Sequence, residues 1–374
     1  MIDPGRPVVL YGAGQLGLLA LAFCRHIGIN VRYVLDRNAA PGQLLNGQVP
    51  VLLPAQIEAD QDCPVLITVA TSPYSPIARD LGGWRWTNVL PFYDYAQHFA
   101  SAHPLNNGWF AGALCPQDRT EIRAVLDRLA DNHSRNAYLQ FLAWRVFRED
   151  WVFPDAPVRA EDKYSIPQVA AVLSDKEDLV DVGAYDGRFL FHLLEVTHGR
   201  FSSALLFEPD QANLDLLQPA LARLDPLQRQ KVEVSSQAVS DASGLAGFSQ
   251  GFDMASRLSA EGNSTVTSVR IDELGLRPSY LKIHVEGAEL KVLRGAAGTL
   301  SNCRPIIAAT VYHNRDGLWE TASFLMNLLE GYDFLFRLHT WCGTGAVLYA
   351  IPRERPKRSR APGTQRITAW KSRE

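Results

Sequence analysis

Hydrophobic and polar positions in the first part of the chain follow the pattern of alternating strands and helices. A β-branched run at Val8–Tyr11 meets a glycine turn, a helical pattern covers Leu16–His26, and a second apolar run ends at Asp36. Further strand-like runs lie at Val65–Ala70 and Asn88–Phe92, between turns rich in proline and glycine. Strands that alternate with helical segments in this way predict a parallel sheet.

The same pattern begins again at residues 178–210, where a strand, a glycine turn, a helix, a second strand and an acidic residue follow one another. Before it, at residues 118–150, apolar residues recur at spacings of three and four, which predicts two amphipathic helices. A further helix is expected from Glu289 to Leu300. The later strands are expected at Lys231–Ser235, Tyr280–Val285, Ile306–Tyr312, Phe334–Leu338 and Ala346–Ile351.

These patterns predict an α/β fold with two Rossmann-like units, of which the first is a nucleotide-binding-like domain, joined by a helical bridge. The expected boundaries are residues 1–105 for the first domain, 106–165 for the bridge, 166–352 for the second domain and 353–374 for a tail. The tail holds eight basic and two acidic residues, interrupted by proline, serine and glycine. It is expected to be disordered.

Composition narrows the class of protein. With 47% apolar and 21% charged residues, the 374-residue chain is typical of a folded globular protein. No run approaches about 18 consecutive apolar residues, so a membrane span is not expected. A secretory signal is not expected either, because the chain opens with Asp3 and Pro4 and enters a glycine motif by Gly12. The spacing of the five cysteines suggests neither a disulfide framework nor a metal site, which favours the cytoplasm. Because the basic tail carries an excess of positive charge, the rest of the chain has a negative net charge, and nucleic acid is therefore not an expected partner. The sequence leaves the oligomeric state open.

The first glycine turn matches the GxGxxG pattern of dinucleotide-binding loops. Gly12 permits the tight turn, Gly14 permits close approach of a pyrophosphate, and Gly17 permits close packing of helix on strand. Asp36, at the end of the next strand, is suited to accept hydrogen bonds from ribose hydroxyls. The motif predicts a nucleotide or nucleotide-sugar site, and the alternative is a module that uses its glycines only for packing.

The second glycine turn, residues 181–187, differs because it carries acidic residues that would repel a diphosphate. Asp181 or Asp186 can meet an ammonium group, and Glu208 at the end of the next strand can accept from both hydroxyls of a ribose. A zwitterionic ligand with an α-amino group and a ribose meets these demands. S-adenosylmethionine is such a ligand.

Residues from about 164 to 352 resemble the FkbM-type family of S-adenosylmethionine-dependent methyltransferases. The resemblance implies a class I methyltransferase-like domain. Residues 1–100 are similar instead to Rossmann-like modules of bacterial sugar and capsule biosynthesis proteins. The segments that carry the methyltransferase resemblance are DVGAYDG (181–187), FEPD (207–210), AVSD (238–241), SVRIDEL (268–274), YLKIHVEGAELKVLRGA (280–296), VYHNRDGLWE (311–320) and RLHTWCGTGAVLYAIP (337–352).

The resemblance also implies the positions of the cofactor residues. It places Glu208 on the ribose, with Gln237 and Ala238 at the adenine. Family members commonly read K-x-D-x-E-G where this chain has His284 in place of the aspartate, which concerns the acceptor side more than the cofactor. The residues expected around the methionine part are Asp181, Gly183, Ala184, Tyr185, Asp186 and Gly187.

Candidate groups for the acceptor chemistry gather at predicted strand ends. Lys282, His284 and Glu286 alternate along one expected strand, so they are predicted to share a face, and His313 ends the neighbouring strand. Two roles remain open. Either His313 is a general base with Lys282 orienting the acceptor, or His284, Glu286 and His313 hold a divalent metal that lowers the pKa of a hydroxyl.

Together these features predict an S-adenosylmethionine-dependent methyltransferase that O-methylates a hydroxyl of a sugar, glycan or secondary metabolite. One alternative is an NAD(P)-dependent oxidoreductase that uses the amino-terminal GxGxxG loop. The other is a non-catalytic nucleotide-sugar-binding protein, in which changes such as that to His284 have removed activity.

Overall fold

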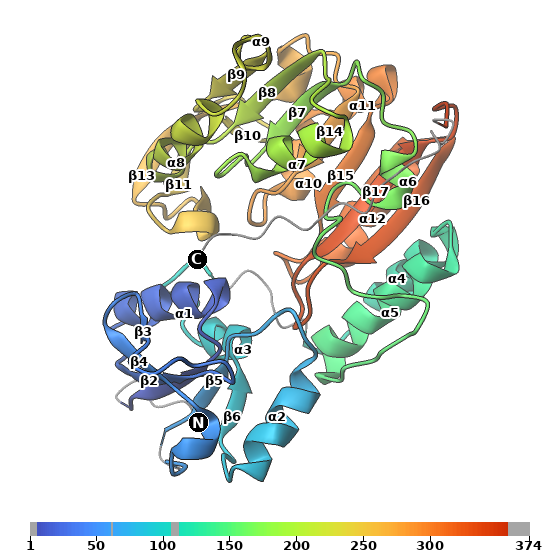
Figure 1. Cartoon of the computed structure of the whole chain (residues 1–374). Helices are drawn as coiled ribbons and strands as arrows, with labels where there is room; N and C mark the ends of the chain where they lie inside the picture. Colours follow the sequence, from blue (N-terminus) through green and yellow to red (C-terminus); the bar gives the residue numbers. More distant parts are fainter. Residues whose placement is uncertain (1–5, 61–62, 106–111, 358–374) are drawn as a thin grey trace.

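The computed structural model describes residues 6–60, 63–105 and 112–357. It contains two α/β units, with the helices between them packed beside one edge of the second unit (Figure 1). The predicted α/β fold with two parallel-sheet units is confirmed. Most of the predicted tail, residues 358–374, lies outside the described residues. For residues 353–357 the prediction of disorder is wrong, because ion pairs such as that of Arg355 with Glu177 hold them on the second unit. Within the described part of the chain, no helix combines the length and hydropathy that crossing a membrane requires.

The amino-terminal unit is a six-stranded sheet in the order β3-β4-β2-β1-β5-β6, parallel except for β3. Alternate residues of β1 face opposite sides: Val8 and Leu10 pack against α1 and α3, whereas Val9 and Tyr11 pack against α2. The strands are β1 (Val8–Tyr11), β2 (Val31–Leu35), β3 (Leu44–Leu45), β4 (Val49–Leu52), β5 (Val65–Ile67) and β6 (Val89–Pro91). The helices are α1 (Gln15–His26), η1 (Pro54–Gln56), α2 (Tyr74–Gly83) and α3 (Phe92–Gln97).

The second unit is a seven-stranded sheet in the order β16-β17-β15-β14-β7-β8-β9, in which only β17 runs antiparallel to its neighbours. The strand order reverses between β7 and β14, so this is the switch point at which ligands of such sheets bind. The strands are β7 (Asp178–Val182), β8 (Ser203–Phe207), β9 (Val232–Ser235), β14 (Tyr280–Ile283), β15 (Ile306–Thr310), β16 (Tyr332–Leu338) and β17 (Ala346–Pro352).

Helices cover both faces of this sheet. Successive strand residues alternate between two apolar clusters, one containing α6, α7 and α8 and the other containing α10, α11 and α12. The helix predicted from residue 289 to 300 is divided into α10 and α11 at Ala296. The helices are α6 (Pro167–Ala170), α7 (Arg188–Val196), α8 (Gln211–Leu221), α9 (Pro226–Arg229), α10 (Glu289–Gly295), α11 (Ala297–Cys303) and α12 (Gly317–Leu328).

A small four-stranded sheet, in the order β10-β13-β11-β12, stands beside the second unit and was not predicted. Its two longer strands, β11 and β13, are half-exposed, and β10 and β12 have only two residues each, so none has the apolar run by which sequence patterns reveal buried strands. The elements of this region are β10 (Ala238–Val239), β11 (Gly244–Ser249), η2 (Asp253–Ala255), β12 (Arg257–Leu258), β13 (Ser264–Val269) and η3 (Ile271–Glu273).

The two predicted bridge helices, α4 (Pro116–Arg128) and α5 (Asn132–Phe147), pack on the second unit, where α4 contacts α12 and α5 contacts β16. Asp131 caps α5 by accepting from the Ser134 backbone N–H at 2.7 Å, and it also pairs with Arg337 of β16 at 2.7 Å. These helices therefore belong to the core of the second unit as well as connecting the two.

The two units also touch directly. The Trp341 N–H donates to the Ala70 carbonyl at 2.7 Å, so the turn between β16 and β17 is hydrogen-bonded to the loop that follows β5 of the amino-terminal unit. On the other side, the ring of Phe252 packs edge-on against the rings of His26 and His103 at 5.2 and 5.1 Å. These contacts enclose a cavity between the units.

A buried carboxylate supports the start of β7. The side chain of Glu177 is fully buried; it pairs with Arg355 at 2.7 Å and accepts a hydrogen bond from Ser279. Burial alone would raise the pKa of Glu177, but the hydrogen bonds from Ser279 and Arg355 outweigh it and lower the pKa. The carboxylate is therefore held in its charged form.

Candidate active site

A cavity of about 2460 Å³ lies between the two units, at the carboxyl ends of β7, β8 and β14. Gln15 and Leu16 of α1 line it from the amino-terminal unit, and the loops of the second unit supply the opposite wall. Pockets for one small molecule usually measure about 300–1,000 Å³. The cavity is therefore large enough for a cofactor and an acceptor side by side.

The loops that follow β7 and β14 meet at the switch point of the sheet. Gly183 has a φ of +81°, and an added Cβ there would lie 1.9 Å from the His284 carbonyl oxygen. Only glycine allows this close approach, because any other side chain would collide with backbone. The glycine turn and the turn that carries His284 are thus fixed against each other.

Most residues predicted to bind the cofactor line this cavity. Asp181 and Gly187 do not: Asp181 lies under the loop, and Gly187 begins α7 with a φ of +80°. The seven that line it are Gly183, Ala184, Tyr185, Asp186, Glu208, Gln237 and Ala238. The structure thus brings residues from three strand ends to one surface.

Glu208 follows β8 and is buried, with an exposed fraction of 5%. Its Oε1 accepts from the Asp210 N–H at 3.0 Å and from Asn213 at 3.2 Å, whereas Oε2 accepts from the Tyr185 N–H at 2.8 Å. Burial raises the pKa of Glu208, and these hydrogen bonds only partly oppose it. A carboxylate has about four acceptor positions, so one position on Oε2 is left for a ligand.

Lys282 does not lie beside His284 and Glu286 as predicted; its side chain contacts residues of the glycine turn instead. Its Nζ pairs with Asp181 at 2.7 Å and donates to the Gly183 carbonyl at 2.6 Å, with only 3% of the residue exposed. The prediction that one strand carries all three residues is wrong, because β14 ends at Ile283. Lys282 therefore stabilises the glycine turn through its bonds to Asp181 and Gly183.

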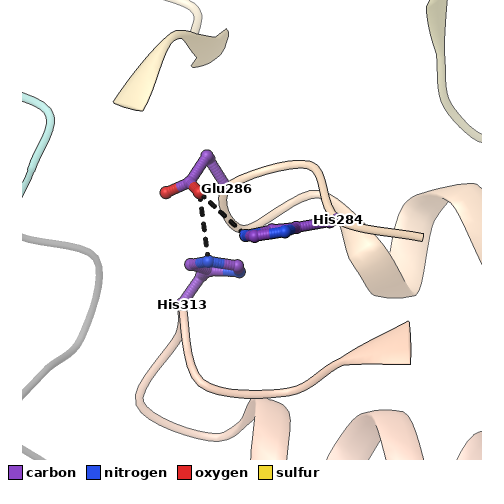
Figure 2. Close-up of side chains that lie close together, drawn as sticks. All are labelled: His284, Glu286 and His313. Atoms are coloured by element: carbon purple, nitrogen blue, oxygen red, sulfur yellow. Dashed lines mark ion pairs between the residues drawn. The ribbon is translucent and has the colours of Figure 1, made fainter. Parts of the chain in front are cut away.

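His284, Glu286 and His313 form a compact group, called here the His–Glu–His cluster (Figure 2). The Nε2 atoms of both histidines lie 3.2 Å from Glu286 Oε1, and their rings stack at 5.1 Å between centroids. Glu286 has a φ of +53°, an unfavourable conformation for a residue with a side chain. The turn after β14 maintains it and directs the carboxylate at both imidazoles.

A second layer of side chains orients the two imidazoles. The Tyr164 hydroxyl lies 2.8 Å from His284 Nδ1, and Glu289 Oε1 lies 2.5 Å from His313 Nδ1. The Glu289 carboxylate also accepts from the Thr310 hydroxyl at 2.8 Å. Because each Nδ1 atom has a partner, each Nε2 atom is turned toward Glu286.

The two histidines of the cluster differ in their pKa because their charged neighbours differ. Burial alone would lower the pKa of His313, but Glu286 and Glu289 raise it to about 9. Burial and, to a smaller extent, the ammonium of Lys163 lower the pKa of His284 to about 3. The two imidazoles hold the pKa of Glu286 well below its usual range, although burial opposes this. At neutral pH the cluster therefore combines a charged carboxylate, a charged His313 and a neutral His284.

The amino-terminal glycine loop lies in the other unit, and none of its four predicted residues lines the cavity. Gly12 has a φ of +113°, and a Cβ on Gly17 would lie 2.2 Å from the Gly12 carbonyl oxygen, so both glycines are required by packing. Gly14 has open space around it. The Asp36 carboxylate accepts from the Ala13 N–H at 2.9 Å, in the same way that Glu208 accepts in the second unit.

Sequence reasoning missed the roles of Glu289, Tyr312 and Tyr164 around the cluster. Tyr312 lies next to His313 in the chain, and its hydroxyl is 3.2 Å from His284 Nε2. Glu289 lies three residues after Glu286, in the segment YLKIHVEGAELKVLRGA (280–296) that carries the family resemblance, and this proximity could have indicated its role. For Tyr164, 120 residues before His284, the sequence carried no signal of this contact.

The sheet order, the glycine turn and the acidic residue after β8 define a doubly wound domain of the methyltransferase class. The family model of the methyltransferase FkbM domain matches residues 181–336. The resemblance to the FkbM-type family that the sequence indicated is confirmed over these residues.

One solved structure shows the same fold over most of this chain, and others resemble a part of it. The crystal structure of methyltransferase FkbM from Methylobacillus flagellatus KT is similar over 92% of this chain and 89% of that chain, with a TM-score of 0.63 and 22% identity. A precorrin-6y C5,15-methyltransferase from Geobacter metallireducens GS-15 matches 53% of this chain and 95% of its own, with a TM-score of 0.31 and 15% identity. An SAH-bound methyltransferase from Podospora anserina matches 65% of this chain and 98% of its own, with a TM-score of 0.32 and 11% identity. Among curated proteins, no match was found.

Proposed function

We propose that this protein transfers the methyl group of S-adenosylmethionine to a hydroxyl of a sugar, glycan or related metabolite. The observation that carries the proposal is that His284 and Glu286 of the His–Glu–His cluster line the same cavity as the glycine turn and Glu208, with the buried His313 behind them. Donor and acceptor residues are thus brought to one space at the switch point of the sheet. The FkbM-type domain supports the methyltransferase class.

On the donor side, the residues fit the cofactor. Gly183 and Ala184 present backbone without bulky side chains, and Glu208 offers one acceptor position for a ribose hydroxyl. Gln237 and Ala238 line the cavity where the adenine is expected. The bound cofactor supplies an electrophilic methyl group on a sulfonium. The chain's part is to hold it so that the acceptor oxygen approaches in line.

In the reaction, the acceptor oxygen forms a bond to the methyl carbon while the sulfur–methyl bond breaks and its electron pair stays on sulfur. The hydroxyl proton must leave the acceptor, and this is the task assigned to the His–Glu–His cluster. Two mechanisms were predicted for it, a His313 general base or a bound divalent metal. Because Glu286 and Glu289 raise the pKa of His313 to about 9, that imidazole keeps its proton at neutral pH unless a metal ion displaces the proton from Nε2, and it is poorly suited to accept a proton from the hydroxyl.

The geometry supports the metal mechanism. Two imidazole nitrogens and one carboxylate oxygen converge, and all three ligand atoms lie within 4.8 Å of one another. Each ligating imidazole has its other nitrogen bonded, to Tyr164 or to Glu289, as is usual for metal-binding histidines. Two nitrogen ligands favour a transition metal such as Mn²⁺ or Zn²⁺ over Mg²⁺. Such an ion would lower the pKa of a hydroxyl that it coordinates, so that the hydroxyl proton would be released to solvent.

Calorimetry with Mn²⁺ and Zn²⁺ tests the metal, and methyl transfer from labelled donor tests the reaction. We expect the protein after chelation to bind one ion, and His284→Ala to lose that binding while keeping its affinity for S-adenosylmethionine. His198→Ala is the control, because this histidine is exposed and stands outside the cluster. If the protein binds no metal and stays active after chelation, the metal role is contradicted. A side chain acting as general base would then have to accept the hydroxyl proton.

Parallel titration with S-adenosylmethionine and NADH separates the proposed function from its alternatives. We expect S-adenosylmethionine, and not NADH, to bind to the second unit with a measurable heat. Binding of NADH with hydride transfer would favour the oxidoreductase, and a protein that binds the donor but never transfers its methyl group would favour the non-catalytic alternative. The amino-terminal loop remains a proposed nucleotide or nucleotide-sugar site, supported by the open space at Gly14.

A further inference from the structure

Two cationic side chains that line the cavity have no part in the chemistry above. Lys163 lies in the segment before α6, and Arg257 lies on β12 of the small sheet. Both residues are half-buried. They come from different elements and face the same space as the His–Glu–His cluster.

Neither cation has an anionic partner among the residues that the structure describes. The ammonium of Lys163 stands 5.1 Å from the centre of the Tyr164 ring, and neither it nor the Arg257 guanidinium forms an ion pair or a side-chain hydrogen bond within that part of the chain. The neighbouring Arg188, in contrast, is held by Asp186 at 2.6 Å. Two positive charges at this cavity are thus left for a ligand.

Retaining unpaired cations in a partly buried place is unfavourable without a ligand. Both side chains are partly removed from water, and this burial lowers the pKa of Lys163, to about 8, and that of Arg257. Glu286 acts on both in the opposite direction, so both lie within electrostatic range of the cluster. Glu286 Oε1 contacts the two imidazoles, and among the described residues no ion pair joins Glu286 to Lys163 or Arg257.

Arg257 also stands where the two units meet. It acts electrostatically on His103 of the amino-terminal unit, whose pKa is lowered to about 4 by burial first and then by His26 and Arg257. His103 is therefore neutral and does not repel a cation or attract an anion. A negative group bound at Arg257 would lie beside the interface, where the amino-terminal unit helps to exclude water from it.

We propose that the methyl acceptor is an anion, and that Arg257 and Lys163 bind its carboxylate or phosphate while its hydroxyl lies at the His–Glu–His cluster. This rests on the proposed methyltransferase function and narrows its substrate class. A neutral sugar would leave both cations unpaired, whereas a sugar acid, a hydroxy acid or a phosphorylated sugar would pair them. The methyl donor also has a carboxylate, so the test must separate the two anions.

The first test uses the full-length protein with S-adenosylmethionine labelled in the methyl group and a bacterial metabolite extract. We expect the labelled product to be retained by an anion-exchange resin at about pH 8. Arg257→Gln and Lys163→Met should each lower the rate at limiting extract by about tenfold to a hundredfold, the loss expected for one charge-assisted contact. Their affinity for S-adenosylmethionine, measured by calorimetry, should stay within about twofold of the wild-type value, since the donor is assigned to other residues.

Arg223→Gln is the matched control. Arg223 also lines the cavity, but it is exposed and lies over the Phe191 ring at 5.2 Å. It should behave like the wild type, which would show that the general positive field of the cavity is not the cause.

A second measurement does not need the natural acceptor. Donor-saturated protein is titrated with inorganic phosphate and with malonate, and Arg257→Gln should weaken binding of at least one of them about tenfold or more. A labelled product that passes through the resin, binding of neither anion, or a variant that loses donor affinity instead would each overturn the anionic acceptor. A protein that binds no S-adenosylmethionine would overturn the proposed function itself.

Discussion

Substituting Glu208 by glutamine tests the donor site most directly. The side chain keeps its size, so α8 and the loop before it should remain folded, but the negative charge at the end of β8 is removed. Because both carboxylate oxygens already accept hydrogen bonds from the protein, the amide has to place its NH₂ group against a backbone N–H donor. The glutamine therefore presents a less favourable surface to the ribose as well as a neutral one.

The structure sets the size of the effect. Three acceptor positions of the carboxylate are used by Tyr185, Asp210 and Asn213, so one remains for a ribose hydroxyl. A hydrogen bond to a charged group contributes about 1.5–3 kcal/mol. Its loss should weaken binding of S-adenosylmethionine about 10-fold to 150-fold.

Isothermal titration of the wild type and the variant with S-adenosylmethionine gives the ratio of affinities, and circular dichroism checks the fold. Glu233→Gln is the control, because Glu233 is an exposed acid on the neighbouring strand β9. An unchanged affinity in a folded Glu208→Gln protein would refute the assignment of the ribose to this residue.

Three further predictions concern the rest of the molecule. Gly14→Val should leave the melting temperature nearly unchanged, because a side chain there meets open space, but it should abolish stabilisation by any nucleotide or nucleotide-sugar that raises the melting temperature of the wild type. Lys282→Met should lower the free energy of unfolding by about 3–5 kcal/mol in urea denaturation, because it leaves Asp181 buried and unpaired; Asp181→Asn added to it should recover most of the loss. Glu177 has a folded pKa below its unfolded value of about 4.3, so its contribution to stability is present above about pH 4.3 and is lost as the pH falls through the lower folded pKa. Urea unfolding should therefore show a smaller difference between about pH 6 and about pH 3 for Glu177→Gln than for the wild type, and equal differences would contradict the shift.

Local sequence patterns determined much of the framework. The strand at Val8–Tyr11 was predicted with its observed ends, and the helix after it within one residue, because apolar periodicity and glycine turns act over a few neighbouring positions. The place of Glu208 at a strand end followed from the same pattern, since an acidic residue closes the second strand of each unit. Strand ends near the site were less accurate: β14 and β15 stop two residues early, where the chain turns to carry the cluster.

Only the tertiary structure decided which polar groups meet. The spacing of Lys282 and Glu286 predicted that they share one face of a strand. Lys282 pairs instead with Asp181 on the adjacent strand β7, because the parallel register places those two side by side. Tyr164 reaches His284 across 120 residues. The partners of a buried charge are set by strand register and by the packing of distant segments, and neither quantity is encoded in a local pattern of apolar residues. The sequence therefore determined the strands and their glycine turns, whereas the assembly of the two units decided the cavity and the charges that face it.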